Sequence, residues 1–588
     1  MKRLKMIRDV MKKRGIDYYI IPSSDYHQSE YVSGYFKGRE FISGFTGSAG
    51  TLLIGLDDAY LWTDGRYFIQ AENELNGSGI SLMKMRVPGY PTIDEWIRDN
   101  VKSEETLGFD GGVFSVNQYK KFLEISRLNN FKISMENDLL NEVWITRGGL
   151  PKNKVFIHEE IYCGKSTSKK LEEVKINMKE QKAENYIISS LDDIAWLCNI
   201  RGNDIEFNPV ALAYVILNEG YANLYIDKDK IDTEIENKLK SEGVNIYDYN
   251  DIEGHVKLIK GTTIIDGSKL NAKVYSCLNE NVKVIDEVNI TTKLKAIKND
   301  VEIANTKKSQ IRDGVAMVKF IKWLKESLGR EKVTELSVGK KLSSIRAEGK
   351  DYKGDSFNTI AGYKEHAAMM HYSATEATNY EIKEEGMLLV DSGAQYLDGT
   401  TDITRTFILG PITDEEKTDF TLVLKGHISL STARFLKGTT GVNLDVLARR
   451  PLWNYGIDYK CGTGHGIGFF LNVHEGPQGI RLEGNTTVLE PGMIITNEPG
   501  VYKEGKHGIR TENTLLVVKD IISEEFGEFY KFETISYCPI DLNGIDANML
   551  TSEEKEWLNN YHNTVFEKLS PYLNEEEVKF LKEETREI

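Results

Sequence analysis

The chain has 588 residues. That is more than one hydrophobic core can organise, so we expect about three or four domains. It carries 74 lysines and arginines against 90 aspartates and glutamates, a formal charge of −16, which argues against a general nucleic-acid or anionic-membrane binder. Hydrophobic residues make up 40% and aromatic residues 10% of the chain, enough to build cores, and this excludes wholesale disorder.

The cysteines and the amino-terminal segment bear on the compartment. The five cysteines are scattered and no CxxC pair occurs, so neither a disulfide framework nor a thiolate zinc site is supported. The first residues, MKRLKMIRDVMKKRG, are charged throughout, and no apolar run of about 18 residues follows. We therefore expect a cytoplasmic protein that does not enter a membrane.

A weak internal repeat occupies the first half. Residues 15–28 (GIDYYIIPSSDYHQ) and 183–196 (AENYIISSLDDIAW) both describe a short strand that ends in a polar turn. A second echo at nearly the same offset joins residues 60–64 (YLWTD) to 223–227 (NLYID). Both segments alternate strand-like and helical runs, so the pattern predicts two related α/β lobes over about 1–150 and 151–300. Chance similarity between ordinary strands is the alternative.

The second half differs. A lysine-rich helical segment begins near Thr291, and apolar residues at helical spacing follow it between 311 and 321, so a third domain is expected over 301–525. Further on, Thr551 with Glu554 has the form of a capping box, and Asn574 precedes an acidic first turn. These signals predict a folded helical extension over 526–588.

Candidate chemistry concentrates in the third domain, where six of the ten histidines lie between 361 and 510. Asp391 follows three aliphatic residues, and Asp402 lies on the expected return strand of a hairpin that turns around Tyr396–Gly399. We expect the two aspartates to be near cross-strand neighbours. Two carboxylates so placed repel one another unless a cation or a proton lies between them.

A second carboxylate pair and three histidines complete the set. Glu498 and Glu512 are symmetric about Gly505 in a second expected hairpin. His465 is bracketed by glycines in GTGHGIG, which lets the backbone approach a site closely, and His474 and His371 each follow apolar residues. A single acid or histidine of this kind is usually structural. Two aspartates, two glutamates and a histidine on successive hairpins argue against a purely structural role.

Several motifs resemble a known family. LVDSGAQYLDGTTDITRT, GTGHGIG, NVHEGP, NEPGVY and GIRTEN together resemble the pita-bread metallopeptidases, and within them aminopeptidase P (Xaa-Pro aminopeptidase). REFISGFTGSAGT and LWTDGRYFIQA resemble that family's creatinase-type amino-terminal domain, and CPIDLNGID with EWLNNYH resembles the carboxyl-terminal segment of its long, three-domain cytosolic form. The resemblance thus implies an α/β and α+β architecture, with two creatinase-type lobes before a pita-bread catalytic domain.

By position, the resemblance makes Asp391, Asp402, His465, Glu498 and Glu512 the ligands of two divalent metal ions. Asp402 and Glu512 would bridge the ions, His465 and Glu498 would complete one, and Asp391 the other. A ligand set dominated by oxygen with one imidazole suits a hard ion. Mn²⁺ is the family's usual metal, although Zn²⁺ and Co²⁺ stay open.

The resemblance also implies a mechanism. A metal-bridging hydroxide would attack the carbonyl before proline and release the amino-terminal residue from Xaa-Pro peptides. His371 and His474 match substrate-side histidines that stabilise the developing oxyanion, and Glu498 would also shuttle a proton to the leaving nitrogen. Arg510 matches a family arginine near the metals, with a plain salt bridge to a ligand carboxylate as the equal alternative.

One residue departs from the family pattern. Cys461 stands four residues before His465, where relatives commonly carry histidine, and a small buried thiol is favoured over a redox-sensitive gate. Rival functions are a prolidase-like dipeptidase or a methionine aminopeptidase on the same fold, or a non-catalytic peptide-binding protein. The family implies a homodimer that acts on peptides.

Overall fold

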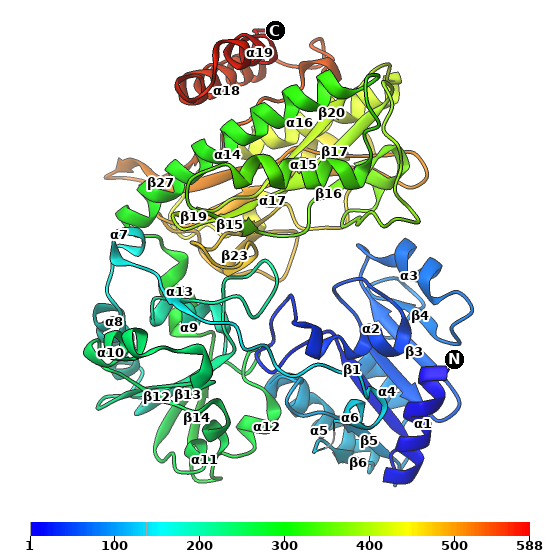
Figure 1. The fold of residues 1–588 in the computed structure, drawn as a ribbon, viewed down its shortest axis with the longest axis vertical. Coiled ribbons are helices and arrows are strands. Elements are labelled where there is room, and N and C mark those ends of the chain that lie inside the picture. Colours follow the sequence, from blue (N-terminus) through cyan, green and yellow to red (C-terminus); the bar gives the residue numbers. More distant parts are fainter. Residues whose placement is uncertain (1, 137) are drawn as a thin grey trace. The chain divides into compact units, whose positions relative to one another are not determined.

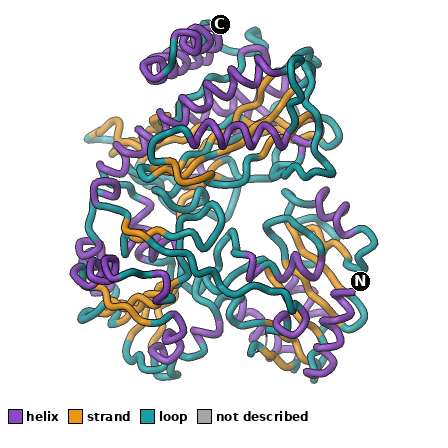
Figure 2. The backbone as a smooth tube through the Cα atoms, viewed as in Figure 1, coloured by secondary structure: helices purple, strands orange, loops and turns teal. Residues whose placement is uncertain are grey.

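The computed structural model describes every residue except 1 and 137. The chain forms two compact units, Met1–His158 with Lys165–Lys293 and Glu159–Gly164 with Leu294–Ile588 (Figure 1). Helices and strands are interleaved in each unit (Figure 2). The two lobes expected from the sequence fall in the first unit, except that Glu159–Gly164, with α7 (Glu160–Cys163), and residues 294–300 belong to the second.

The first lobe is a six-stranded sheet in the order β4-β3-β2-β1-β5-β6 with helices around it. Its strands are β1 (Tyr18–Pro22), β2 (Thr51–Gly55), β3 (Ala59–Thr63), β4 (Ser81–Lys84), β5 (Thr106–Phe109) and β6 (Lys132–Ser134). Its helices are α1 (Lys2–Arg14), α2 (Gly38–Ser43), α3 (Phe68–Leu75), α4 (Ile93–Asn100), α5 (Val116–Asn129) and α6 (Leu140–Val143). In α1, Leu4, Ile7 and Met11 recur at helical spacing and are buried in the lobe's core.

The second lobe repeats this arrangement with the order β12-β11-β10-β8-β13-β14. Its strands are β8 (Asn185–Ile188), β10 (Ala213–Asn218), β11 (Ala222–Ile226), β12 (Val244–Tyr247), β13 (Thr262–Ile265) and β14 (Lys283–Asp286), and β7 (Phe156–Ile157) pairs with β9 (Ile200–Arg201). Its helices are α8 (Thr167–Glu180), α9 (Leu191–Leu197), α10 (Thr233–Ser241), α11 (Ile252–Val256) and α12 (Ala272–Tyr275).

The two sheets agree in strand sense as well as in order. β1 lies antiparallel to β2 and parallel to β5, and its counterpart β8 lies antiparallel to β10 and parallel to β13. Tyr19 and Tyr186, matched by the sequence echo, are both buried in the corresponding strand. The predicted repeat is therefore confirmed, and the alternative of chance similarity is wrong.

The two lobes are joined within the first unit by backbone hydrogen bonds and by His27. Val116 N–H donates to Leu270 O at 2.9 Å, and Ala272 N–H donates in return to Phe114 O at 2.8 Å. His27, fully buried, contacts Ser189 O through Nδ1 and the Tyr249 hydroxyl through Nε2, each at 2.8 Å. A side chain of the first lobe thus forms hydrogen bonds with two residues of the second lobe.

The second unit contains a repeat that the sequence analysis missed. In its first half, α14 (Asp300–Ser327) and α15 (Glu335–Ala347) precede a sheet in which β17 (Met387–Ser392) pairs antiparallel with β16 (Ile360–Tyr363) and β20 (Ile403–Ile408). In its second half, α16 (Asp414–Ser431) and α17 (Gly441–Trp453) precede strands in which β24 (Ile494–Asn497) pairs antiparallel with β22 (Gly464–Gly466) and β27 (Asn513–Ser523). Each half is therefore two helices followed by three strands, with the second strand in the middle.

Further strands extend both halves. The remaining strands are β15 (Tyr352–Asp355), β18 (Ala394–Tyr396), β19 (Gly399–Thr400), β21 (Arg434–Leu436), β23 (Glu475–Ile480), β25 (Gly500–Lys503), β26 (His507–Arg510) and β28 (Gly527–Thr534). Short 3₁₀ turns occur in both units. Those of the first unit are η1 (Gly34–Phe36), η2 (Lys228–Lys230) and η3 (Tyr249–Asp251), and those of the second are η4 (Lys364–Ala368), η5 (Leu542–Gly544) and η6 (Ser570–Tyr572).

The helix expected from Thr291 onward is two helices. α13 (Ile290–Ala296) ends before Ile297, and Asn299 then caps α14 by accepting the N–H groups of Val301 and Glu302. Glu302 completes a capping box there, so the break follows from the sequence at 299–302. The predicted helical start near Thr291 is confirmed, and the break at Ile297–Asn299 divides the helical segment into two.

The carboxyl-terminal extension is folded, as predicted. Capping boxes at Thr551 and Asn574 open α18 (Ser552–Leu569) and α19 (Glu575–Glu584). The buried guanidinium of Arg405 donates to the carbonyls of Cys538 and Pro539 and to the Tyr561 hydroxyl at 2.8–3.0 Å. The extension is thereby bonded to β20 of the second unit. Among the described residues, no helix is long and apolar enough to span a membrane.

We expect His27 to make the first unit sensitive to acid. Burial lowers the pKa of His27 from 6.5 to about 4. Between pH 4 and pH 6.5 the unfolded chain therefore binds a proton on this residue that the folded unit does not bind. As pH falls from 6.5 to 4, this residue should lower the free energy of unfolding by up to about 3 kcal/mol. Hydrogen exchange of peptides covering β1 and β8, in urea at a series of pH values, measures this.

The matched comparison is His27→Gln, which keeps hydrogen-bonding atoms but does not titrate. The variant should be less stable than the wild type at pH 7, and the difference should shrink toward pH 4. A stability difference that stays constant over this range would rule out the proposed linkage.

Candidate metal centre

The first aspartate pair lies on one hairpin, with a register two residues from the predicted one. β17 pairs with β20 so that Asp391 faces Thr404, and the hairpin tip continues the same register through β18 and β19. Asp402 therefore stands opposite Gly393. The predicted turn is confirmed, since the chain turns through Leu397 and Asp398 between the paired Tyr396 and Gly399, but Asp391 and Asp402 are two residues out of direct register. The two aspartates are diagonal neighbours on one face of the hairpin.

Gly393 allows the close approach between these strands. A Cβ atom at this position would lie 2.0 Å from Thr401 O and 2.2 Å from the Ser356 hydroxyl. A side chain does not fit there. Gly393, two residues after Asp391, thus allows the close strand approach that brings Asp402 near Asp391.

The second hairpin has the predicted symmetry. β24 pairs with β27 and β25 pairs with β26 in one register centred on Gly505, which has a φ of +70°. Glu498 and Glu512 fall opposite each other where the ladder is interrupted. There the Glu498 N–H donates to Thr463 O at 2.8 Å and the Glu512 N–H donates to Thr404 O at 3.1 Å. Both glutamates therefore lie where the hairpin's backbone turns to other strands.

Glycines hold His465 between two strands. A Cβ atom at Gly464 would lie 2.0 Å from Thr496 O, and one at Gly466 would lie 2.2 Å from Glu475 O, so β22 approaches both β24 and β23 closely. His465 Nδ1 is 3.0 Å from Gly466 O, which assigns the ring proton to Nδ1. Nε2 is then the nitrogen that faces the acidic residues.

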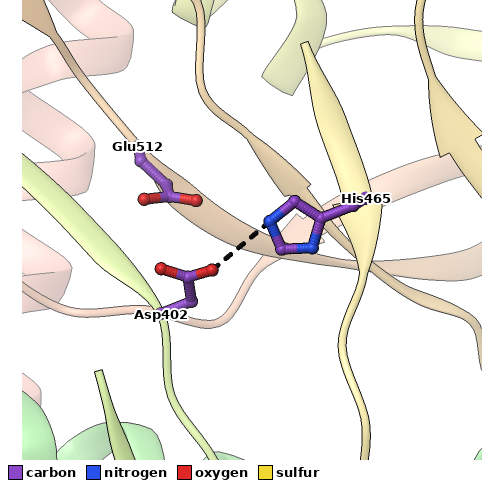
Figure 3. A group of neighbouring side chains, drawn as sticks. All are labelled: Asp402, His465 and Glu512. Carbon is purple, nitrogen blue, oxygen red and sulfur yellow. Dashed lines mark ion pairs between the residues drawn. The ribbon is translucent and has the colours of Figure 1, made fainter. Parts of the chain in front are cut away.

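Side chains from three strands or strand ends converge on this nitrogen. Asp402, His465 and Glu512 each offer an atom within 4.8 Å of the others, and Figure 3 shows the two carboxylates facing each other with the imidazole beside them. His465 Nε2 lies 3.4 Å from Asp402 Oδ2 and 3.4 Å from Glu498 Oε1. The structure thus brings four of the predicted side chains together.

Asp391, the fifth, joins the group through Arg510. The buried Arg510 guanidinium lies 2.5 Å from Asp391 Oδ2, and its Nε donates to the Thr404 hydroxyl at 3.1 Å. That hydroxyl donates in turn to Glu512 Oε2 at 2.7 Å, and the Tyr502 hydroxyl accepts from Arg510 at 2.6 Å. Arg510 therefore forms the salt bridge that the sequence analysis gave as one of two alternatives.

The cluster has an excess of buried negative charge. Burial, with Asp391 and Glu498 nearby, raises the pKa of Asp402 to about 6 against the opposing hydrogen bond from His465. Burial and the same acidic neighbours raise the pKa of Glu512 well above its usual range. For His465, burial alone lowers the pKa, but Asp402 and Glu498 raise it to about 9. The ionised form of these carboxylates therefore requires additional positive charge nearby.

Unused carboxylate oxygens point to what supplies it. Among the described residues, Asp391 Oδ1, Asp402 Oδ1 and Glu512 Oε1 are buried and have no hydrogen-bond partner. Buried carboxylate oxygens without donors are costly unless a cation coordinates them. Carboxylates with one imidazole are a donor set for hard or borderline divalent ions. The residues present therefore fit divalent metal ions.

The two substrate-side histidines lie at different places. The ring of His474 packs edge-on against His465, with centroids 4.3 Å apart and an 84° angle between the planes. His371, half-buried, lies in the loop after η4. η4 packs against β26, since a Cβ atom at Gly508 would lie 1.8 Å from Ala367 O.

Two threonines were missed from the sequence. The Thr404 hydroxyl orients Glu512, and the Thr496 hydroxyl accepts from His465 N–H at 3.0 Å and donates to Glu498 Oε1 at 3.2 Å. Thr404 lies two residues after Asp402, and Thr496 lies two before Glu498. Alternation along a strand places such pairs on one face, and this signal could have identified them.

Cys461 lies near the cluster but not in it. Burial, with Glu498 nearby, raises the pKa of its thiol to about 12. A thiol that stays protonated at neutral pH is a poor nucleophile and a poor redox sensor. This disfavours the redox-sensitive gate, but the thiol is half-buried and not buried as the sequence analysis expected.

Family comparisons agree over the whole chain. Residues 304–519 match metallopeptidase family M24, and 528–588 match the carboxyl-terminal region of that peptidase. Residues 3–134 and 146–302 each match a creatinase/prolidase amino-terminal domain.

Named relatives are similar along their full length. Xaa-Pro aminopeptidase 1 of Dictyostelium discoideum is 38% identical over 100% of this chain and 96% of its own. Aminopeptidase P1 of Arabidopsis thaliana is 37% identical over 100% of this chain and 99% of its own.

Two solved structures match this chain over different lengths. X-prolyl aminopeptidase of Caenorhabditis elegans, described as a cytosolic enzyme with a di-nuclear active site, matches with a TM-score of 0.95 and 32% identity, covering 100% of this chain and 99% of its own. Xaa-Pro dipeptidase of Bacillus anthracis matches with a TM-score of 0.52 and 25% identity, covering 64% of this chain and 99% of its own.

We expect Gly464→Ala to disturb the centre through the backbone alone. The added methyl would meet Thr496 O, so β22 must separate from β24, at a cost of roughly 1–3 kcal/mol. Gly462→Ala is the control, since its Cβ would meet nothing closer than 3.5 Å.

Urea unfolding and hydrogen exchange of peptides covering 461–468 measure the difference between these variants. Equal stability of the two would show that the close strand approach at Gly464 carries no constraint.

Proposed function

Since the chain belongs to the Xaa-Pro aminopeptidases of metallopeptidase family M24, we propose that it removes the amino-terminal residue from peptides whose second residue is proline. It is a metallopeptidase, and so a hydrolase. The observation that carries the proposal is the convergence of Asp402, His465 and Glu512 in a chain that matches such enzymes from end to end. The dipeptidase alternative is less well supported, because that structure covers only 64% of the chain.

Two divalent ions are part of this proposal. Asp402 and Glu512 would bridge them, His465 and Glu498 would complete one, and Asp391 would complete the other, as the unused oxygens and the family's di-nuclear relative support. When bound, the ions supply Lewis acidity and water activation at neutral pH. Mn²⁺ is the proposed metal, because the donors are mostly oxygen.

The chain's own residues then orient the reaction. Arg510 holds Asp391 in place and, through Thr404, Glu512. We propose that His474, whose ring packs on His465, donates a hydrogen bond to the substrate carbonyl, where negative charge develops. His371 is proposed for the same side of the substrate. Glu498 would pass a proton to the leaving proline nitrogen.

The acidic cluster also suits an exopeptidase. A free amino terminus is cationic, and buried carboxylates attract it more strongly than they attract the neutral peptide bonds of a chain interior. This favours cleavage at the first peptide bond of a peptide. It also disfavours a purely binding role, for which four carboxylates in one place would be a liability.

Four further expectations belong with the function. We propose a location in the cytosol, as the relative described as cytosolic supports, and a homodimer, as the family resemblance implies. We also propose the functional division into 1–150, 151–300, 301–525 and 526–588, in which only the third segment carries catalytic residues. Peptides are the proposed partners, and the acidic balance disfavours nucleic acid.

We expect Arg-Pro-Pro to be cleaved with a kcat/KM at least about tenfold above that for an Xaa-Pro dipeptide. Liberated arginine, measured by mass spectrometry with metal-stripped protein after re-addition of Mn²⁺, Zn²⁺ or Co²⁺, tests this. A Met-Ala peptide should not be cleaved. Failure to cleave the tripeptide with any of these ions would reject the proposed activity, and preference for the dipeptide would favour the prolidase alternative.

We expect Asp402→Asn to lose bound metal and to lower kcat by about 10³-fold or more, because a bridging carboxylate is neutralised. Asp398→Asn is the matched control. Asp398 is a buried aspartate four residues away that pairs with Arg312 at 2.8 and 3.0 Å, outside the cluster.

The control should retain its metal, as measured by elemental analysis. Full metal content and activity in Asp402→Asn would contradict the ligand assignment.

A further inference from the structure

Glu475, the residue after His474, is a buried carboxylate shared by two buried lysines. Its Oε1 lies 2.5 Å from Lys298 Nζ and its Oε2 lies 3.3 Å from Lys295 Nζ. The three residues are 3%, 4% and 2% exposed, respectively. Lys298 Nζ also donates to Lys295 O at 3.0 Å, which ties the two lysines together.

The lysines are fixed to the strand that leads to Glu498. Lys298 N–H donates to Gly492 O at 2.9 Å, and Ile297 forms a β-bridge with Met493 just before β24. A Cβ atom at Gly492 would lie 3.0 Å from Lys298 O, so the two segments are in close backbone contact. The lysine segment is therefore a rigid anchor, although it is 177 residues from Glu475 in sequence.

Glu475 in turn fixes one end of the loop that carries His474. Glu475 is the first residue of β23 and pairs with Gly466 of β22. Its Oε2 lies so close to Gly468 that a Cβ atom there would be 3.0 Å from it. The other end is fixed at Leu471, whose carbonyl accepts from Gln395 Nε2 at 2.7 Å. His474 lies between these two anchors, with its ring against His465.

This charge arrangement is not what stability alone would select. Two lysines face one carboxylate in a buried site, and apolar residues of similar volume commonly stabilise a core as well as a buried ion pair does. Charged hydrogen bonds do, however, fix direction and distance more narrowly than apolar contacts. An arrangement of this kind next to a proposed substrate-contacting residue indicates a requirement for precise geometry.

We propose that Glu475, held by Lys295 and Lys298, is a positioning residue that sets the orientation of His474 over the metal centre. The inference rests on the proposed function, in which His474 contacts the scissile carbonyl. Loss of the anchor should let the loop between Leu471 and Glu475 relax and misplace the imidazole while the five metal-binding side chains keep their places. Misplacement by about an ångström can cost about a hundredfold in rate.

The test is a double-mutant cycle in the metal-loaded full-length enzyme, using an Xaa-Pro-Pro tripeptide. Glu475→Gln should lower kcat by about 10- to 100-fold with KM and metal content nearly unchanged, since the interaction lost is made in the transition state. In the His474→Ala background the same change should lower kcat by less than about twofold, because the residue it positions is already gone. Lys298→Arg should restore most of the activity that Lys298→Met loses.

A matched control separates positioning from loss of stability. Asp204→Asn breaks an equally buried carboxylate–lysine pair, with Lys230, in the first unit. It should lower the thermal midpoint by an amount comparable with Glu475→Gln and leave kcat within about twofold.

Each other outcome overturns a distinct claim. If Glu475→Gln lowers kcat by the same factor with and without His474, Glu475 does not act through His474 and the inference fails. If His474→Ala is as active as the wild type, the role of His474 in the proposed function fails instead. If Glu475→Gln does not fold, Lys298→Met and Lys295→Met run the same cycle, and equal losses in both backgrounds again reject the inference.

Discussion

Repulsion among buried carboxylates is the interaction on which the second unit depends. Asp391, Asp402, Glu498 and Glu512 converge where burial already opposes ionisation, and the raised pKa values of Asp402 and Glu512 express that opposition. Among the described residues, the Arg510 guanidinium and the His465 imidazole are the cationic groups that pair with these carboxylates. Divalent cations complete it, so that ion binding and the local fold are thermodynamically linked.

The internal repeat of the second unit explains how such a cluster is assembled. In each half the middle strand of three ends at an acid, Asp391 or Glu498, and a second acid, Asp402 or Glu512, precedes the third strand. Corresponding positions of two similar halves therefore supply the four carboxylates. His465 comes from the first strand of the second half alone, which leaves the centre chemically asymmetric.

How much could be predicted from the sequence depended on local markers. Gly505 marks the tip of the second hairpin, and the symmetry of Glu498 and Glu512 followed from it. The turn of the first hairpin was predicted correctly at Tyr396–Gly399, but Asp391 and Asp402 are not symmetric about it and so are diagonal neighbours. The capping boxes of the extension were legible, yet the same signal at Asn299 was overlooked. The contact of Lys298 with Glu475 spans 177 residues, and no local pattern encodes so distant a pairing.

The buried Arg405 has a consequence for how such chains can evolve. Its guanidinium donates to backbone carbonyls on both sides, Glu512 O in the catalytic segment and Cys538 O and Pro539 O in the extension, and to the Tyr561 hydroxyl on α18. Removing the residues after 526 would take the Cys538, Pro539 and Tyr561 acceptors away from this guanidinium, one residue from Thr404, and leave part of its donors unmet. We therefore expect the extension to be inherited together with the catalytic segment.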